Sequence, residues 1–199
     1  MVVYLDSGGE TPLLRSDIIY KRVLDVHPEF CHKLEKQGVV YTRTIPENDD
    51  KTSAIGRGWT NTFNAADRDG VELAATGLGV SLEWQANGDV KTISPKLPAI
   101  RTVNGRKVWF NSVIASYTGT SDSRNDSTKM VCYADGSLLD PVHVNDTVKL
   151  MSENAASIPW QNGDVFWIDN NQVLHSRAAN FTPPRKIMAF LGADCPYEQ

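Results

Sequence analysis

Four histidines are the side chains of this sequence best suited to bind a metal or move a proton, and His175 stands apart from the others. His175 comes after a strongly apolar run that ends at Asp169. Arg185, ten residues after His175, and Lys186 lead into a second apolar run. A histidine at a strand end and a cation entering the next strand can face one cavity. Imidazole is a good ligand for iron, and a guanidinium binds a carboxylate with two hydrogen bonds. By spacing alone, a purely structural histidine is the simpler interpretation.

The other candidate motifs point away from several enzyme classes. His27, His32 and His143 fall in segments that are expected to be helical, where surface or capping roles are usual. The tripeptide His27-Pro28-Glu29 has the form His-x-Glu, but Pro28 suits the first turn of a helix, so we predict no metal there. The sequence contains no Walker A loop, dinucleotide fingerprint, Cys-x-x-Cys pair or Gly-x-Ser-x-Gly elbow.

The composition predicts one ordinary globular domain. The chain has 199 residues, 41% of them hydrophobic and 22% charged, and a net charge of −4. That balance gives no support to a nucleic-acid partner or an anionic membrane surface, and no apolar run approaches the ~20 residues of a membrane helix. The first residues do not resemble a signal peptide, and the three cysteines are widely spaced, so we expect a cytoplasmic protein without disulfides.

The elements that must position these residues are short strands with helices inserted between them. Helices are predicted over 16–26, 28–37, 67–76 and 141–153, capped by Ser16 and Asp140 at two of their starts. Strands are predicted over 2–5, 39–45, 80–84, 90–93, 99–103, 106–114, 156–160, 165–169 and 186–191. Ile18, Ile19 and Val23 are expected to form the buried stripe of the first helix. Because strands and helices do not alternate regularly, a mixed, mainly β fold of the sandwich or jelly-roll type is favoured over a doubly wound sheet.

Six short blocks, in this order, resemble one enzyme family. They are Gly8-Gly9-Glu10-Thr11-Pro12, Gly56-Arg57-Gly58-Trp59, Val108-Trp109-Phe110-Asn111, Pro159 to Asp164, Ile168 to His175, and Pro184-Arg185-Lys186-Ile187. The set is similar to the TauD/TfdA-type Fe(II)/2-oxoglutarate dioxygenases, and within them to a plant-type clavaminate synthase-like subgroup of unassigned substrate. The resemblance extends from Gly8 to Leu191.

This resemblance implies a double-stranded β-helix, or jelly roll, that holds one Fe(II) ion. In the family the iron is bound by a His-x-(Asp/Glu) motif and a distal histidine, and 2-oxoglutarate chelates the metal as cosubstrate. His175 matches the distal iron ligand, and Thr11 matches the threonine that binds the far carboxylate of 2-oxoglutarate. Arg185 is our choice for the arginine that shares this carboxylate, and Lys186 is its rival.

The resemblance also suggests where a small-molecule substrate would bind. Trp109 and Asn111 are expected to line the pocket, although packing in the core explains them equally well. The polar segments 47–53 and 118–128 are candidate lids. Phe190 takes the position where some taurine-type members have an arginine, which makes a sulfonate substrate less favoured.

The sequence departs from the family at the metal site. The His-x-(Asp/Glu) motif should precede Gly8, and the residues before Gly8 contain no histidine. We therefore expect residues 1–199 to be a single dioxygenase domain that lacks its N-terminal part, with an incomplete jelly roll. The alternatives are a non-catalytic binding module that keeps a carboxylate pocket at Thr11 and Arg185, and a protein with a purely structural role. The oligomeric state is left open.

Overall fold

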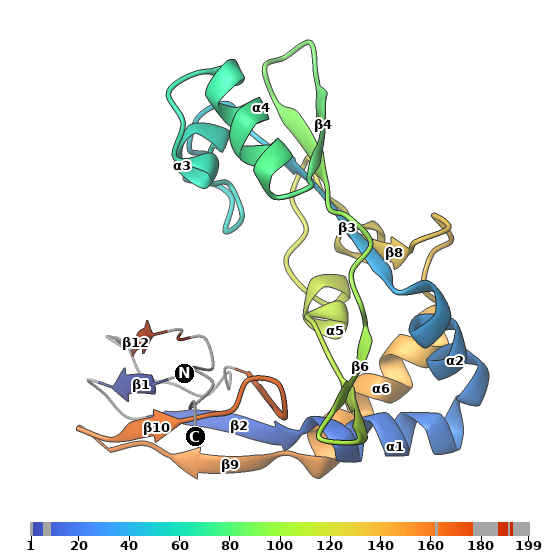
Figure 1. Cartoon of the computed structure of the whole chain (residues 1–199). Helices are drawn as coiled ribbons and strands as arrows, with labels where there is room; N and C mark the ends of the chain where they lie inside the picture. Colours follow the sequence, from blue (N-terminus) through green and yellow to red (C-terminus); the bar gives the residue numbers. More distant parts are fainter. Residues whose placement is uncertain (1, 6–8, 162, 177–186, 191, 193–199) are drawn as a thin grey trace, which may run out of the picture.

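The computed structural model describes residues 2–5, 9–161, 163–176, 187–190 and 192 (Figure 1). The strands are β1 (Val2–Leu5), β2 (Glu10–Arg15), β3 (Val39–Ile45), β4 (Ser81–Trp84), β5 (Val90–Ile93), β6 (Ile100–Val103), β7 (Arg106–Trp109), β8 (Val131–Tyr133), β9 (Ala156–Pro159), β10 (Val165–Trp167), β11 (Val173–His175) and β12 (Ile187–Phe190). The helices are α1 (Ser16–Val26), α2 (Pro28–Gln37), α3 (Trp59–Phe63), α4 (Arg68–Gly77), α5 (Val113–Tyr117) and α6 (Pro141–Asn154), with a short 3₁₀ turn, η1 (Ser127–Lys129).

Two small antiparallel sheets lie against one another at the end of the molecule that holds β1 and β12 (Figure 1). Their strand orders are β10-β1-β12 and β11-β2-β9. The rings of Trp160 and Phe166 connect the two sheets, with centroids 3.9 Å apart. The backbone N–H of Trp160 also donates to the Gly9 carbonyl over 3.0 Å. Segments from the two ends of the chain therefore form a single unit.

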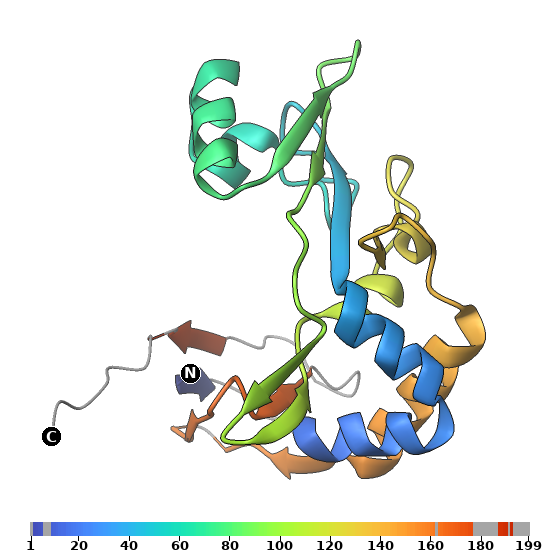
Figure 2. The same cartoon turned by 45° about the vertical axis from the view of Figure 1, so that its right-hand side comes forward.

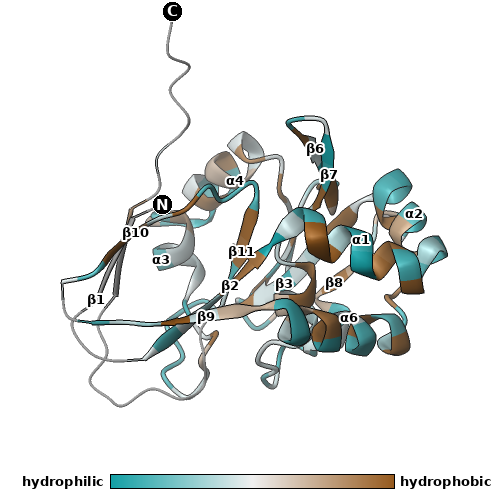
Figure 3. Cartoon of the chain, turned by 90° about the horizontal axis from the view of Figure 1, so that it is seen from below, coloured by the Kyte–Doolittle hydropathy of each residue, from teal (hydrophilic) through white to brown (hydrophobic). Residues whose placement is uncertain are grey.

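The main hydrophobic core lies where α1, α2 and α6 meet, beside the two-sheet end (Figure 3). Ile19, Val23, Cys31 and Leu34 are fully buried in it. The predicted stripe of α1 was wrong at Ile18, which is 37% exposed. Successive helical residues are turned by about 100°, so the neighbours Ile18 and Ile19 point in different directions, and the core selects Ile19.

A second, smaller core lies in an arm that extends away from the helices (Figures 1 and 2). The arm is built from α3, α4, the β4–β5 hairpin and the far end of β3. Its core consists of Ile45, Trp59, Val71 and Val90, and the Trp59 indole N–H donates to the Gly88 carbonyl over 3.0 Å. The turn at Asn87-Gly88 and the strands beside it confirm the hairpin expected from the sequence.

Local signals were correct at some element boundaries and wrong at others. Asp140 caps α6 as predicted, with its carboxylate accepting a 2.8 Å hydrogen bond from the Val142 N–H. Ser16 is not a cap: it lies inside α1, and its N–H donates to the carbonyl of Gln172. The strand predicted over 106–114 ends at Trp109, because Asn111 adopts a left-handed φ of 72° and α5 begins shortly after it.

The described residues therefore form a mixed α and β structure whose sheets are antiparallel throughout. Among these residues, no helix combines the length and the apolarity that crossing a bilayer requires.

Candidate functional site

Thr11 lies in the centre of the β11-β2-β9 sheet and is buried. Its Oγ1 accepts a 2.8 Å hydrogen bond from the indole N–H of Trp160, which is buried as well. A threonine hydroxyl has two lone pairs and one proton, so it can accept from Trp160 and donate as well, and Thr11 has a further contact besides the one with Trp160. The indole therefore holds the Thr11 side chain in one orientation.

His175 is the last residue of β11, next to Thr11 on the same sheet. It pairs with Leu13 of β2, and Thr11 lies two residues before Leu13. Because side chains alternate along a strand, this register places His175 and Thr11 on one face, as diagonal neighbours. Partial burial lowers the pKa of His175 below its ordinary value, although part of its surface stays exposed. The neutral imidazole favoured in this way is the form that binds metals.

A cavity of about 740 Å³ lies beside this sheet; we call it the α6 cavity. The paired residues Leu14 and Leu174 line it, so it lies mainly against the face opposite to Thr11. It reaches the edge strand β11, where His175 contributes to its lining. His175 thus lies at the border between the Thr11 face and the cavity.

Trp109 and Asn111 both line the α6 cavity. Trp109 is also a core residue, only 1% exposed and with its ring 6.1 Å from that of Phe30. Its indole nitrogen is buried and has no hydrogen-bond partner in the described part of the chain. Asn111 turns the chain out of β7, and its Oδ1 accepts from the Ser112 N–H over 3.0 Å. Their role toward a substrate remains a prediction.

The other predicted ligands, Arg185 and Lys186, lie outside the described residues, so the structure does not test them. Among the residues that the structure describes, no three His, Cys, Asp or Glu side chains gather where a metal ion could be held. His27 has a structural contact instead, since its Nε2 lies 2.8 Å from an Asp146 carboxylate oxygen and ties the α1–α2 junction to α6.

The sequence analysis missed the contribution of α6 to the cavity. Val148, Met151, Ser152 and Ala155 line it, at the i, i+3, i+4, i+7 spacing of one helix face. That spacing is readable in the sequence, but nothing in it distinguishes a face that meets a cavity from one that meets the core.

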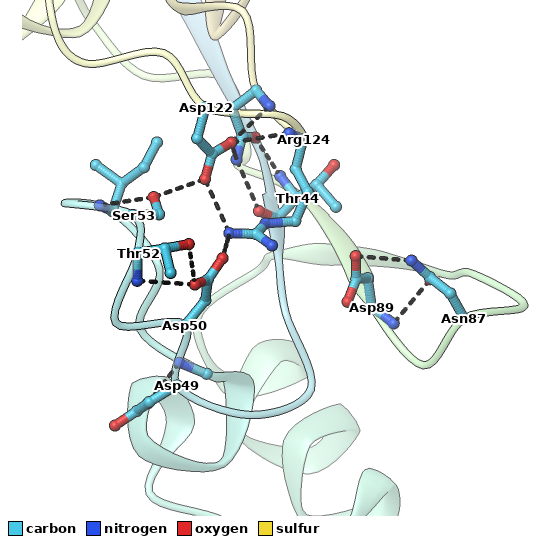
Figure 4. Close-up of polar contacts among 12 residues, drawn as sticks. Thr44, Asp49, Asp50, Thr52, Ser53, Asn87, Asp89, Asp122 and Arg124 are labelled. Atoms are coloured by element: carbon cyan, nitrogen blue, oxygen red, sulfur yellow. Dashed lines mark hydrogen bonds and ion pairs between the residues drawn. The ribbon is translucent and has the colours of Figure 1, made fainter.

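The two polar segments predicted as lids are joined by Arg124 (Figure 4). Its Nη2 donates to a carboxylate oxygen of Asp50 at 2.7 Å and to one of Asp122 at 3.0 Å. Hydrogen bonds from Thr52 and Arg124 lower the pKa of Asp50 to about 2. Desolvation opposes the same change at Asp122, but hydrogen bonds from Ser53, Arg124 and Asn125 still lower the pKa of this carboxyl to about 2. The loops are therefore held to each other, and a lid function for them stays a prediction.

Comparison with known proteins identifies a family and a relative of this chain. The family model described as taurine catabolism dioxygenase TauD, TfdA family matches residues 1–191. A clavaminate synthase-like protein of Arabidopsis thaliana is 46% identical over 186 residues, which make up 92% of this chain and 56% of that protein. The chain thus spans a little over half the length of this relative.

Proposed function

Because this chain belongs to the taurine catabolism dioxygenase TauD, TfdA family, we propose that it serves as an Fe(II)- and 2-oxoglutarate-dependent oxidoreductase acting on a small organic molecule. The observation that carries the proposal is the position of His175 and Thr11 on one face of the β11-β2-β9 sheet. The two antiparallel sheets joined by Trp160 would then belong to a jelly roll.

The proposal assigns the two faces of this sheet to two molecules. The Thr11 hydroxyl would donate to the far carboxylate of 2-oxoglutarate, in the orientation that Trp160 holds. The substrate would occupy the α6 cavity on the opposite face. His175, at the border of the two, would be one iron ligand and would bring the oxidising centre next to both molecules.

The described residues fit this iron centre only in part. A facial triad needs two histidines and one carboxylate, and among the described residues no three such side chains gather around a common point. They do not assemble the centre by themselves. In the family, iron and 2-oxoglutarate supply the oxidation; what this chain contributes in our proposal is one imidazole, one oriented hydroxyl and a substrate cavity.

A chimera tests the proposal. The part of the Arabidopsis relative without a counterpart here would be joined to this chain in its natural order, and succinate release from 2-oxoglutarate measured with Fe(II). We expect release that stops when iron is chelated and that falls at least 100-fold in His175→Ala. His32→Ala, which removes an exposed histidine of α2, is the matched control and should retain full release.

Two results would count against the oxygenase. If His175→Ala leaves succinate release unchanged, His175 is not the iron ligand that we propose. A chimera that folds and binds 2-oxoglutarate without metal, but never releases succinate, would favour a non-catalytic binding module with a carboxylate pocket.

A further inference from the structure

We infer that the substrate is an uncharged, mainly apolar molecule bearing a hydroxyl or carbonyl oxygen, bound in the α6 cavity. This inference rests on the proposed function, because it takes the cavity that reaches His175 as the substrate site. The volume of about 740 Å³ lies within the range of roughly 300–1,000 Å³ that is typical of small-molecule sites. The chemistry of the cavity wall determines the class of molecule.

One wall is the apolar stripe of α6. The stripe begins in the core with Val144, which is fully buried. One turn later it reaches the cavity, where Val148 is 39% exposed, Met151 and Ser152 follow on the same helix face, and Ala155 follows at the C-cap. A helix stripe of this kind is normally covered by protein. Here it faces a cavity, so an apolar ligand would cover it and remove it from water.

The facing walls combine apolar and aromatic side chains with uncharged polar ones such as Ser157 and Asn170. Leu14 and Leu174 form one of them, and the ring of Phe110 contributes to another. Among the described residues that line the cavity, none is Asp, Glu, Lys or Arg. The Arg101 guanidinium stacks on the Phe110 ring, 3.8 Å from its centroid, and does not line the cavity. From the described lining residues an anionic ligand would gain no ionic partner for the hydration that it loses, which selects against charge.

Asn111 provides a polar anchor in this wall. Its Oδ1 is engaged by the Ser112 N–H, and its amide nitrogen makes no hydrogen bond within the described part of the chain. Both amide protons are therefore available to an oxygen on the ligand. The left-handed backbone at Asn111, with φ 72°, places this side chain at the point where β7 leaves the sheet. A hydroxyl or carbonyl group is the complement of such a donor.

Calorimetry with two probes of the same ring tests the charge preference. The whole chain, without metal or 2-oxoglutarate, would be titrated with 2-naphthol, which is neutral at pH 7, and with 2-naphthalenesulfonate. We expect the naphthol to bind at least tenfold more tightly. Val148→Lys should weaken naphthol binding at least tenfold. Val142→Lys makes the same change on the same helix at a residue that is 60% exposed and outside the cavity, and it should change neither affinity.

A second pair of variants tests the anchor. Asn111→Asp keeps an acceptor for the Ser112 N–H and a residue that tolerates a left-handed φ, but it removes the amide donors. Asn104→Asp makes the same change in the β6–β7 turn, where φ is 49°. We expect naphthol binding to fall at least fivefold in the first variant and to stay unchanged in the second.

Three results would overturn the inference: a sulfonate that binds as tightly as the naphthol, a Val148→Lys variant that behaves like Val142→Lys, or an Asn111→Asp variant that behaves like Asn104→Asp. Neither probe titration depends on iron. A failure of succinate release with these binding results intact would therefore refute the oxygenase, whereas release without the naphthol preference would refute only the substrate class.

Discussion

The hydrogen bond between Trp160 and Thr11 should contribute measurably to stability, and Thr11→Val tests it. Valine has nearly the shape of threonine, so the substitution leaves no cavity but removes the oxygen that accepts from the indole. Trp160 is only 4% exposed and Thr11 only 8%, so in the Thr11→Val variant the indole N–H is left without this acceptor and without water. An unsatisfied buried donor costs about 1–3 kcal/mol. In a chain of this length, a loss of about 2 kcal/mol lowers the Tm by roughly 4–8 °C.

Equilibrium unfolding in urea, followed by circular dichroism, measures the loss. Thr11→Ser is the control, because it keeps the hydroxyl and should recover most of the stability. Thr11 also has contacts other than that with Trp160, and a double-mutant cycle separates them. In a Trp160→Phe background no indole donor is left, so Thr11→Val should cost about 1–3 kcal/mol less than it does in the unmodified chain, and the cost that remains measures the other contacts of Thr11.

An equal cost of Thr11→Val in both backgrounds would refute this reasoning, because it would show that the hydroxyl acts through another partner. The same variants bear on the proposed function. If Thr11 also binds the carboxylate of 2-oxoglutarate, Thr11→Val should weaken that binding in the chimera more than Trp160→Phe does.

Three further perturbations follow from the same structure. Arg124→Met should destabilise the chain in urea at pH 7, and this loss of stability should become smaller as the pH falls from about 4 to 2. The reason is that the pKa values of Asp50 and Asp122 are each lowered to about 2. The stability that these carboxylates contribute is fully present above their ordinary pKa values and is lost as the pH falls through 2. A cost that does not change with pH would contradict this origin. Leu34→Ala should lower the free energy of unfolding by about 2–5 kcal/mol, because Leu34 is fully buried among α1, α2 and their neighbours; a cost below 1 kcal/mol would show that the core collapses around the gap. Trp167→Thr should change stability by less than about 0.5 kcal/mol, because this indole is 83% exposed, and should reduce aggregation measured by light scattering; unchanged scattering would show that this surface does not drive association.

Several elements could be predicted from the sequence because their signals are local. Asp140-Pro141 marks the start of α6 because a carboxylate accepts from the first free N–H groups and proline tolerates the first turn. The Asn104-Gly105 turn joins β6 to β7 because both residues adopt positive φ angles, 49° and 74°. The family could also be identified from the order of short blocks, and the family model matches residues 1–191.

Only the tertiary structure decided which candidate residues meet. Thr11 and His175 are far apart in the sequence, and their common face follows from the register of β2 with β11, which depends on long-range pairing. What packs against each helix also decides which of its residues are buried. On α1 the core covers Ile19 and not Ile18, and on α6 the apolar stripe faces the core at Val144 but the cavity at Val148. Periodicity states which residues share a face of an element, but the partner of that face comes from other parts of the chain. For this protein, the sequence by itself determined the family and the types of residue available for chemistry. It predicted most of the elements, but not β2, β8, β11, α3 or α5. The tertiary structure decided that Trp109, Asn111 and His175 surround one cavity, because only the packed chain brings β7, α6 and β11 together.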